Sequence, residues 1–123
     1  KYNLPKPNTL VLVYPVITMG EFTHTDSRYN LLGKQPLADM IDLLSVEKQV
    51  TSDYPPTFLW CGDADTCVVP QNSHAMTAAL ERAGVPHKFI EYAGVGHGVG
   101  LNTGGTAEPW FNEAVNFWLK RKG

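Results

Sequence analysis

Apolar residues cluster along the chain in short runs that predict three strands. Residues 9–14, 57–60 and 87–92 are rich in β-branched, aromatic and other apolar side chains, and prolines stand beside each run. Continuous apolar runs of this length are typical of strands in parallel sheets, whose two faces are both covered. We therefore expect the first strand to be buried on both faces, the second to be buried, and the third to be apolar on one side.

Two helices are predicted where apolar residues recur at helical spacing. The first begins after Pro70 and is ended by Gly84 and Pro86. The second opens at Glu108 and Pro109 and ends in the basic residues 120–122, which matches the direction of the helix dipole. Its apolar stripe is expected to cover the sheet as core residues: Trp110, Phe111, Ala114, Val115, Phe117 and Trp118.

The segment between the first two strands has a weaker pattern. Residues 19–36 are polar, contain two glycines and lack a sustained period, so we predict a long loop there. Residues 37–44 have enough apolar positions for one or two helical turns, and Ser45 is expected to cap a further short helix ending near Val50.

This order of strands and helices predicts an α/β fold with parallel strands and right-handed crossovers. A chain of 123 residues is long enough for one domain or for part of one. Three buried strands make a narrow sheet with edges that need covering, so the pattern favours one side of a larger doubly wound sheet.

Composition excludes several classes of function. The hydrophobic content of 43% is that of a folded protein, and a net charge of -2 argues against a nucleic-acid partner. No apolar run approaches the roughly 20 residues that span a bilayer. The two cysteines, which flank one loop, are too few for a disulfide framework and favour a reducing compartment such as the cytoplasm.

The candidate chemistry follows two neighbouring strands. Asp63 and Asp65 come after the second strand, and His97 stands between glycines after the third. In open parallel sheets, ligand sites lie at the carboxyl ends of the strands, where these loops meet. A metal site is not expected, because the spacing of Cys61 and Cys67 does not suit zinc and the loop does not fit the calcium pattern.

A longer series of motifs resembles the carboxyl-terminal half of an α/β-hydrolase of the esterase and lipase (carboxylesterase) family, which includes acetylxylan and feruloyl esterase-like proteins. The resemblance implies a parallel sheet between two helical layers. The motifs are Tyr14-Pro-Val-Ile17, Asn30-Leu-Leu-Gly33, Ser45-Val-Glu47, Val50-Thr51, Pro55-Pro-Thr-Phe-Leu-Trp60, Asp65-Thr-Cys-Val-Val-Pro70, Asn72-Ser73, Gly84-Val-Pro86 and Gly96-His97-Gly98.

The resemblance implies a catalytic triad in the chain order Ser, Asp, His. The acid corresponds to Asp65, since the family places valine and proline where Val68 and Pro70 stand, and Asp63 is the alternative. The histidine corresponds to His97. The resemblance also implies a small-molecule ester as the substrate, and neither a metal nor an organic cofactor.

The nucleophile is missing from these motifs. None of the four serines that could be considered lies in a Gly-x-Ser-x-Gly elbow: Ser27, Ser45, Ser52 and Ser73. We therefore expect residues 1–123 to be a partial α/β-hydrolase domain, inactive until a serine is supplied. Two alternatives remain open: a non-catalytic module that associates through its sheet edge with itself or with the missing half, and part of a prolyl oligopeptidase-type serine peptidase.

Overall fold

The computed structural model describes residues 4–121, which form one parallel sheet with helices on both of its faces. The strands pair in the order β1-β2-β3, so the three predicted strands and their parallel arrangement are confirmed. The elements in chain order are β1 (Leu10–Val13), α1 (Thr25–Leu32), α2 (Ala38–Leu44), the 3-10 helix η1 (Val46–Lys48), β2 (Thr57–Gly62), α3 (Gln71–Arg82), β3 (His87–Tyr92) and α4 (Trp110–Arg121).

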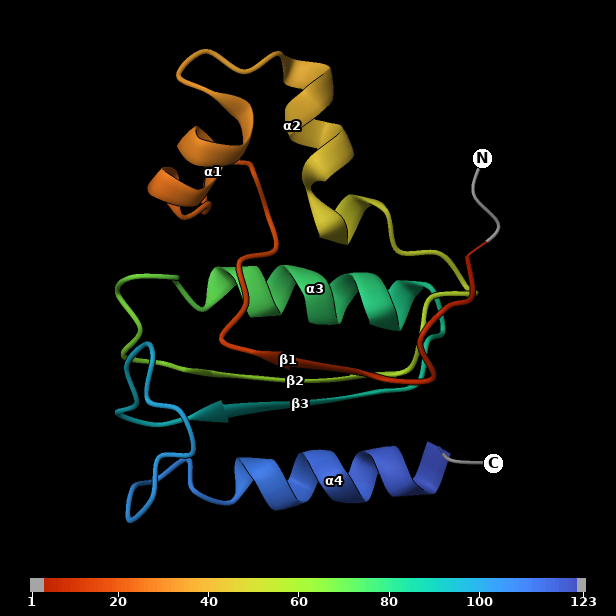
Figure 1. The fold of residues 1–123 in the computed structure, drawn as a ribbon, viewed down its shortest axis with the longest axis vertical. Coiled ribbons are helices and arrows are strands. Elements are labelled where there is room, and N and C mark those ends of the chain that lie inside the picture. The colour runs from red at the N-terminus through yellow and green to blue at the C-terminus, as the bar shows by residue number, and fades with distance from the viewer. Residues whose placement is uncertain (1–3, 122–123) are drawn as a thin grey trace.

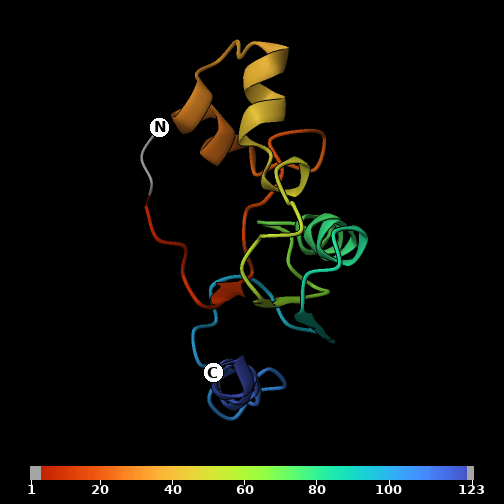
Figure 2. The same cartoon turned by 90° about the vertical axis from the view of Figure 1, so that its right-hand side faces the viewer.

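The helices form two layers around the sheet (Figure 1). Helix α3 lies on one face and α4 on the other, while α1 and α2 stand beyond α3 on its outer side. The view along the strands shows the same three-layer order (Figure 2). This is the α/β/α arrangement of the α/β-hydrolase fold that the sequence predicted.

Strand β2 is the centre of the core because each of its residues is buried. Its side chains alternate between the faces, as the strand period requires. Phe58 and Trp60 pack on the α4 side with Phe117, whereas Leu59 packs on the α3 side with Met76. The two apolar faces of β2 therefore bind both helical layers to the sheet.

Strand β1 is less buried than the sequence predicted. The prediction of burial on both faces is wrong, because Val11 is 44% exposed and the rest of the strand is half-buried. The physical reason is its position: β2 occupies one side of β1, and no described strand pairs with its other side.

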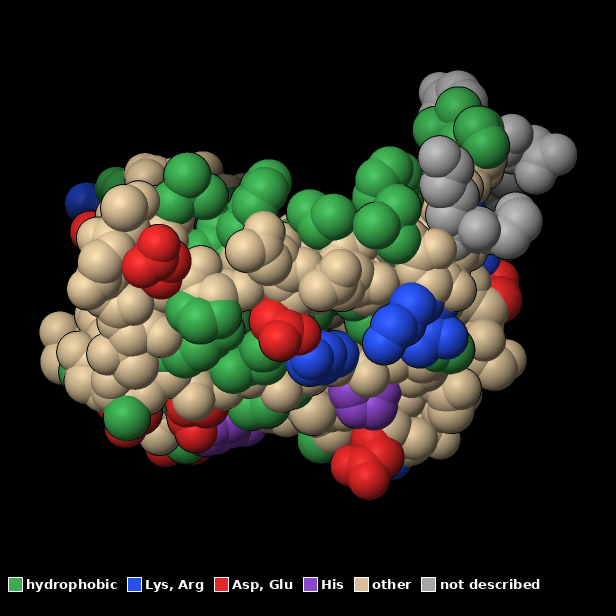
Figure 3. Space-filling model, turned by 90° about the horizontal axis from the view of Figure 1, so that it is seen from below, with side chains coloured by type: hydrophobic (Ala, Val, Ile, Leu, Met, Phe, Trp, Pro, Cys, Tyr) green, Lys and Arg blue, Asp and Glu red, His purple; other side chains and the backbone are tan. Residues whose placement is uncertain are grey.

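The apolar stripe of α4 is only partly a core stripe. Trp110, Ala114 and Phe117 are buried, as predicted. The expectation for Phe111 and Trp118 is wrong, since they are 51% and 42% exposed. Seen from the α4 side, apolar side chains gather along the edge of the molecule next to β1 (Figure 3).

The predicted long loop contains a helix. Residues 25–32 form α1, although no residue of this helix is buried. The His24 side chain caps it by accepting a hydrogen bond from the backbone nitrogen of Ser27, and Gly33 ends it with a φ of 82°. Helix formation here depends on its ends, which explains why the apolar pattern did not indicate it.

The remaining segment agrees in outline with the sequence. Helix α2 corresponds to the predicted turns at 37–44, and η1 to the short helix after Ser45. Ser45 stands at the N-cap position of η1, as predicted, but its side chain makes no capping hydrogen bond. Its hydroxyl instead accepts a hydrogen bond from the backbone nitrogen of Met19 and donates one to the carbonyl of Ile41. No helix within residues 4–121 has the length and apolar character needed to cross a membrane.

The register of the sheet brings the two candidate loops together. Gly62, the last residue of β2, pairs with Tyr92, the last residue of β3. The loops that begin at residues 63 and 93 therefore leave the same edge of the sheet side by side. This places the acid loop and the histidine loop where their side chains can meet.

Candidate active site

Asp65 is a buried carboxylate with a partner for each oxygen. It is 2% exposed. Its Oδ1 accepts hydrogen bonds from the backbone nitrogens of Cys67, at 3.0 Å, and Val68, at 2.9 Å. Its Oδ2 lies 2.7 Å from Nδ1 of His97. Backbone donors fix one oxygen and leave the other aimed at the histidine, a geometry that suits an orienting acid.

The contact with Asp65 sets the tautomer of His97. An ionised carboxylate can only accept hydrogen bonds, so Nδ1 of His97 carries the proton in this pair. The opposite nitrogen, Nε2, then has a free lone pair in the neutral ring. The His97 side chain is 32% exposed, so a substrate or a further segment of protein can approach it. The pair can therefore act as a general base and its orienting acid.

Asp63 contacts the backbone of the histidine loop and not the imidazole. Its Oδ1 accepts a hydrogen bond from the backbone nitrogen of Gly94 at 2.7 Å, and its own backbone nitrogen donates to Tyr92 at 3.1 Å. A further backbone bond joins Ala64 to the carbonyl of Val95. The structure thus brings Asp65 to His97 and gives Asp63 a place in the connection between the loops.

Tyr14, which the sequence analysis did not single out, touches the histidine. Its ring centroid lies 4.6 Å from that of His97, and its hydroxyl accepts a hydrogen bond from the backbone nitrogen of Gly100 at 3.3 Å. The available signal was its place at the carboxyl end of the first strand, directly before Pro15.

A second group that sequence reasoning missed fixes the chain after β1. The buried Asn72 accepts hydrogen bonds from the backbone nitrogens of Ile17, at 2.9 Å, and Thr18, at 3.1 Å. Its amide nitrogen donates to the carbonyl of Phe22 at 2.8 Å. Asn72 therefore attaches the segment leading to α1 to the first turn of α3. A polar residue on the inner face of a predicted helix was the signal for this role.

Helix α1 is joined to the acid loop through a thiol. Sγ of Cys67 lies 3.7 Å from Nε2 of His24, the capping residue of α1.

The two cysteines differ in burial: Cys67 is exposed, whereas Cys61 is buried in β2. Burial raises the pKa of the Cys61 thiol to about 11, so this thiol is protonated at neutral pH. Among the described residues, no group of three or more His, Cys, Asp and Glu side chains could hold a metal ion.

The serines of this chain take other roles. Ser27 bonds to the ring of His24, and Ser45 bonds to the backbone of α2. Ser73 is buried in α3, and Ser52 lies in an exposed turn before β2. Within the described part of the chain, no serine makes a hydrogen bond to His97. The nucleophile predicted by the resemblance therefore has no candidate among the described serines.

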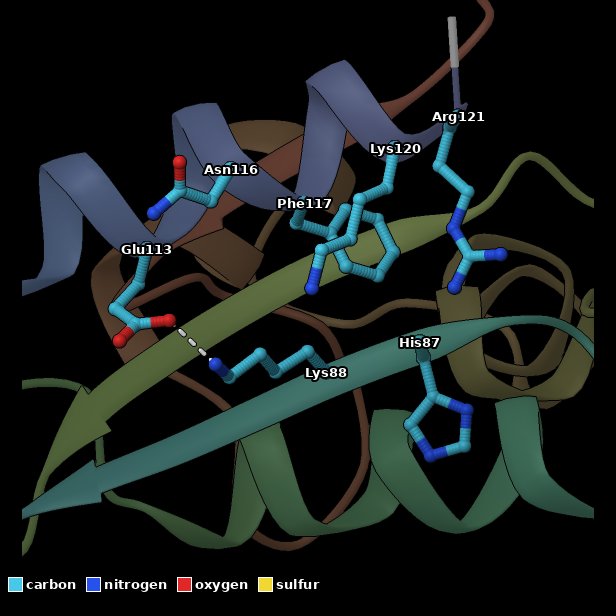
Figure 4. Close-up of a pocket in the computed structure, with 7 residues that line it drawn as sticks. All are labelled: His87, Lys88, Glu113, Asn116, Phe117, Lys120 and Arg121. Carbon is cyan, nitrogen blue, oxygen red and sulfur yellow. Dashed lines mark hydrogen bonds and ion pairs between the residues drawn. The ribbon is translucent and has the colours of Figure 1, made fainter. Parts of the chain in front are cut away.

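A basic hollow lies at the other end of the sheet (Figure 4). It has a volume of about 240 Å³ between β3 and α4, and Lys88 forms an ion pair with Glu113 across it. His87 lines it as the first residue of β3, while His97 follows the opposite end of the same strand. The hollow is thus separated from Asp65 and His97 by the length of β3.

Known proteins have sequences similar to that of this chain. The model of the prolyl oligopeptidase family matches residues 10–122. Endo-1,4-beta-xylanase B of Butyrivibrio fibrisolvens is 36% identical over 94 residues, which are 76% of this chain and 15% of that protein. Acetylxylan esterase of Xylanibacter ruminicola is 30% identical over 120 residues, which are 94% of this chain and 25% of that protein.

A solved structure extends the likeness to three dimensions. The acetyl ester-xyloside bifunctional hydrolase from Caldicellulosiruptor lactoaceticus superposes with a TM-score of 0.84 at 35% identity. The match covers 90% of this chain and 43% of that one. The chain therefore spans less than half the length of each of these three proteins.

Proposed function

Because the chain belongs to the prolyl oligopeptidase family, we propose that it is part of a serine carboxylic-ester hydrolase and supplies the acid and the histidine of its catalytic triad. The observation that carries the proposal is the 2.7 Å contact between Oδ2 of Asp65 and Nδ1 of His97. The choice of esters is supported by the similarity to an acetylxylan esterase and to an acetyl ester-xyloside hydrolase.

In the proposed reaction, His97 moves one proton in two directions. Nε2 takes the proton of a serine hydroxyl, supplied by another segment, as the serine oxygen attacks the ester carbonyl carbon. The imidazolium then gives that proton to the leaving alcohol oxygen as the ester C–O bond breaks. Asp65 stabilises the imidazolium through Nδ1 without taking the proton itself. Water repeats the cycle on the acyl-enzyme, which releases the acid and restores the serine.

The proposed substrates are acetyl or similar short esters carried on xylan or its fragments. This choice comes from the two similar hydrolases, whose names combine acetyl esters with xylan or xylosides. No metal or organic cofactor is required in the scheme, because the charge that develops at His97 is balanced by the Asp65 carboxylate.

Paired substitutions in the full-length protein that contains this chain test the proposal. His97→Ala is expected to lower kcat for p-nitrophenyl acetate by about 10⁴-fold or more, because no base remains for the serine. The matched control is His87→Ala, at the opposite end of β3, which should leave kcat nearly unchanged. Equal activity of the two variants would overturn the assignment of His97.

The two aspartates are separated by the same assay. Asp65→Asn is expected to lower kcat by about 10⁴-fold, because an amide can hold the wrong tautomer of His97. Asp63→Asn should lower it much less, since Asp63 contacts the backbone of Gly94 and not the imidazole. A larger loss in Asp63→Asn would transfer the role of the acid to Asp63.

A peptidase is the second candidate, and the name of the matching family favours it. The same Asp and His could serve cleavage of an amide, because fold and triad do not distinguish the two bonds. Comparing p-nitrophenyl acetate with a prolyl p-nitroanilide on the full-length protein separates them. Higher kcat/KM for the anilide would replace the esterase proposal by the peptidase.

The third candidate is a non-catalytic module that associates through its sheet edge. It is favoured by the exposed Val11 on β1 and by an apolar groove of about 270 Å³ between this residue and α4. Labelling of the full-length protein by a fluorophosphonate probe would contradict a non-catalytic role, because the probe requires an activated serine.

A further inference from the structure

Tyr14 has a backbone conformation that its residue type rarely adopts. Its φ is 37°, in the left-handed region, where a Cβ crowds the backbone. The residue directly follows β1, and its backbone nitrogen still donates to the carbonyl of Trp60 at 2.8 Å. Such a conformation persists when surrounding contacts hold it in place. The side chain should therefore have contacts that outweigh the strain.

The contacts of the Tyr14 side chain converge on the histidine loop. Its ring lies 4.6 Å from the His97 ring with an interplanar angle of 63°, an edge-to-face arrangement. A second edge-to-face contact, at 5.1 Å and 86°, joins it to the buried Trp60. Its hydroxyl accepts the hydrogen bond from Gly100, three residues beyond His97. The ring is thus fixed by the core on one side and holds the histidine loop on the other.

The imidazole of His97 needs such a neighbour. Its hydrogen bond to Asp65 restrains Nδ1, but a single hydrogen bond still leaves the ring some rotation about the side-chain torsions of His97. This rotation moves Nε2, the nitrogen that must meet the serine hydroxyl. A rigid aromatic ring beside the imidazole limits this motion on one side. Aromatic pairs with this geometry attract each other beyond the area they bury.

We propose that Tyr14 is a positioning residue for His97: its ring sets the direction in which Nε2 points while Asp65 sets the tautomer. The proposal rests on the proposed function of the Asp65–His97 pair. The strained backbone at the end of β1 accompanies a ring position between Trp60 of β2 and the imidazole of His97.

Kinetics of the full-length protein provide the first test. Tyr14→Leu keeps apolar volume but loses the ring, and it is expected to lower kcat for p-nitrophenyl acetate by about 10–100-fold while KM changes little, because misplacement of a catalytic group acts on the chemical step. Tyr14→Phe keeps the ring and should retain most of kcat. Tyr14→Asn also removes the ring, and asparagine tolerates a positive φ. If the leucine variant does not fold, the asparagine variant measures the effect of losing the ring on kcat.

The matched control is Tyr92→Leu. Tyr92 also packs edge-to-face on Trp60, with centroids 5.5 Å apart, and its ring makes no described contact with His97. The Tyr92→Leu variant therefore removes an aromatic ring from the core but keeps the ring of Tyr14 beside His97. Equal kcat values in the Tyr14→Leu and Tyr92→Leu proteins would overturn the proposal.

A spectroscopic readout separates this proposal from the assignment of the triad. With ¹⁵N-labelled histidine, the ring nitrogens of His97 report its tautomer and its motion without any ester turnover. Tyr14→Leu should broaden the His97 ring signals, because the ring moves more freely, while the Nδ1–H tautomer held by Asp65 persists; Tyr92→Leu should not broaden them. A fall in kcat with unchanged His97 signals would show a merely structural role. If His97→Ala keeps full activity, the proposed function fails independently of these signals.

Discussion

At Gly62 the acid loop passes so close to the histidine loop that a side chain has no room. A Cβ at this position would lie 1.9 Å from the carbonyl oxygen of Val95. The same oxygen accepts the hydrogen bond from the backbone nitrogen of Ala64, which joins the acid loop to the histidine loop. The two nearest atoms, the carbonyl oxygen and the carbonyl carbon of Val95, belong to the backbone, so they cannot move aside without shifting the histidine loop. The close approach of Asp65 and His97 therefore depends on a glycine at the end of β2.

This dependence predicts the effect of a single methyl group. Gly62→Ala is expected to lower the free energy of unfolding by about 1–3 kcal/mol, through overpacking. Urea unfolding followed by tryptophan fluorescence measures it. The control is Gly96→Ala in the histidine loop, where a Cβ meets no atom within 4 Å. Equal stability of the Gly62→Ala and parent proteins would show that the loops can separate without cost.

Cys61 predicts a loss of stability in alkaline solution. Burial is the main cause that raises the pKa of this thiol from 9.0 to about 11, with the nearby Glu91 and Asp65 carboxylates adding to the effect. Below pH 9 the thiol is protonated in both the folded and the unfolded chain, so the buried Cys61 does not lower the free energy of unfolding there. As the pH rises from about 9 to 11, the unfolded chain loses its proton first, and unfolding becomes more favourable.

The expected size is a fall of about 1–3 kcal/mol in the free energy of unfolding across this pH range, relative to Cys61→Ala. Urea titrations at several pH values give the difference directly. Cys67→Ala is the matched control, because Cys67 is exposed and should keep the full alkaline loss. A parallel pH dependence of the Cys61→Ala and parent proteins would contradict the prediction.

At the scale of elements, the sequence predicted those that bury an apolar face. The period of α3 predicted its limits closely, because this helix buries one apolar face. The apolar run of β3 also predicted its limits, although its residues are half-buried or exposed. Helix α1 could not be found in this way, because it buries no residue. Its apolar residues, including Tyr29 and Leu31, are exposed, so no pattern distinguishes it from a loop.

The stability of α1 should therefore depend on its capping residue. Nδ1 of His24 accepts a hydrogen bond from the backbone nitrogen of Ser27 at 3.3 Å and lies 2.8 Å from its hydroxyl. His24→Ala is expected to destabilise the helix by about 0.5–2 kcal/mol. Hydrogen exchange of the α1 amides, compared with those of α3, measures the local loss.

His24→Asp serves as the control for capping. An aspartate accepts the same backbone hydrogen bond and favours the positive end of the helix dipole, so it should restore slow exchange in α1. Unchanged exchange in His24→Ala would show that tertiary contacts alone hold the helix.

At the scale of the molecule, the sequence predicted which loops form the site but not all of its members. The meeting of the loops that carry Asp65 and His97 was predicted because parallel strands bring their carboxyl ends to one edge, a rule that needs no side-chain detail. The choice of Asp65 over Asp63 came from the resemblance to the esterase family. Tyr14 and Asn72 depend on a strained backbone angle and on a buried hydrogen-bond network. Such features follow from tertiary packing, which the spacing of residue types does not encode.

Strand β1 lies at an edge of the sheet, and no described strand pairs with its outer side. Val11 and α4 line an apolar groove of about 270 Å³, to which Phe111 contributes an exposed ring. Apolar side chains gather on this edge in Figure 3. A strand with one unpaired side beside an apolar groove is a site for pairing with a second chain.

We expect the isolated chain to associate through this edge, and Val11→Lys to prevent it. A lysine at a sheet edge opposes pairing, and its exposed position allows the fold to persist. Sedimentation at several concentrations should show association of the parent chain and a monomer for the variant. The control is Leu43→Lys, which places the same charge on an exposed apolar site of α2. If both variants dissociate equally, association depends on net charge; if the parent chain is a stable monomer, the edge of β1 needs no partner.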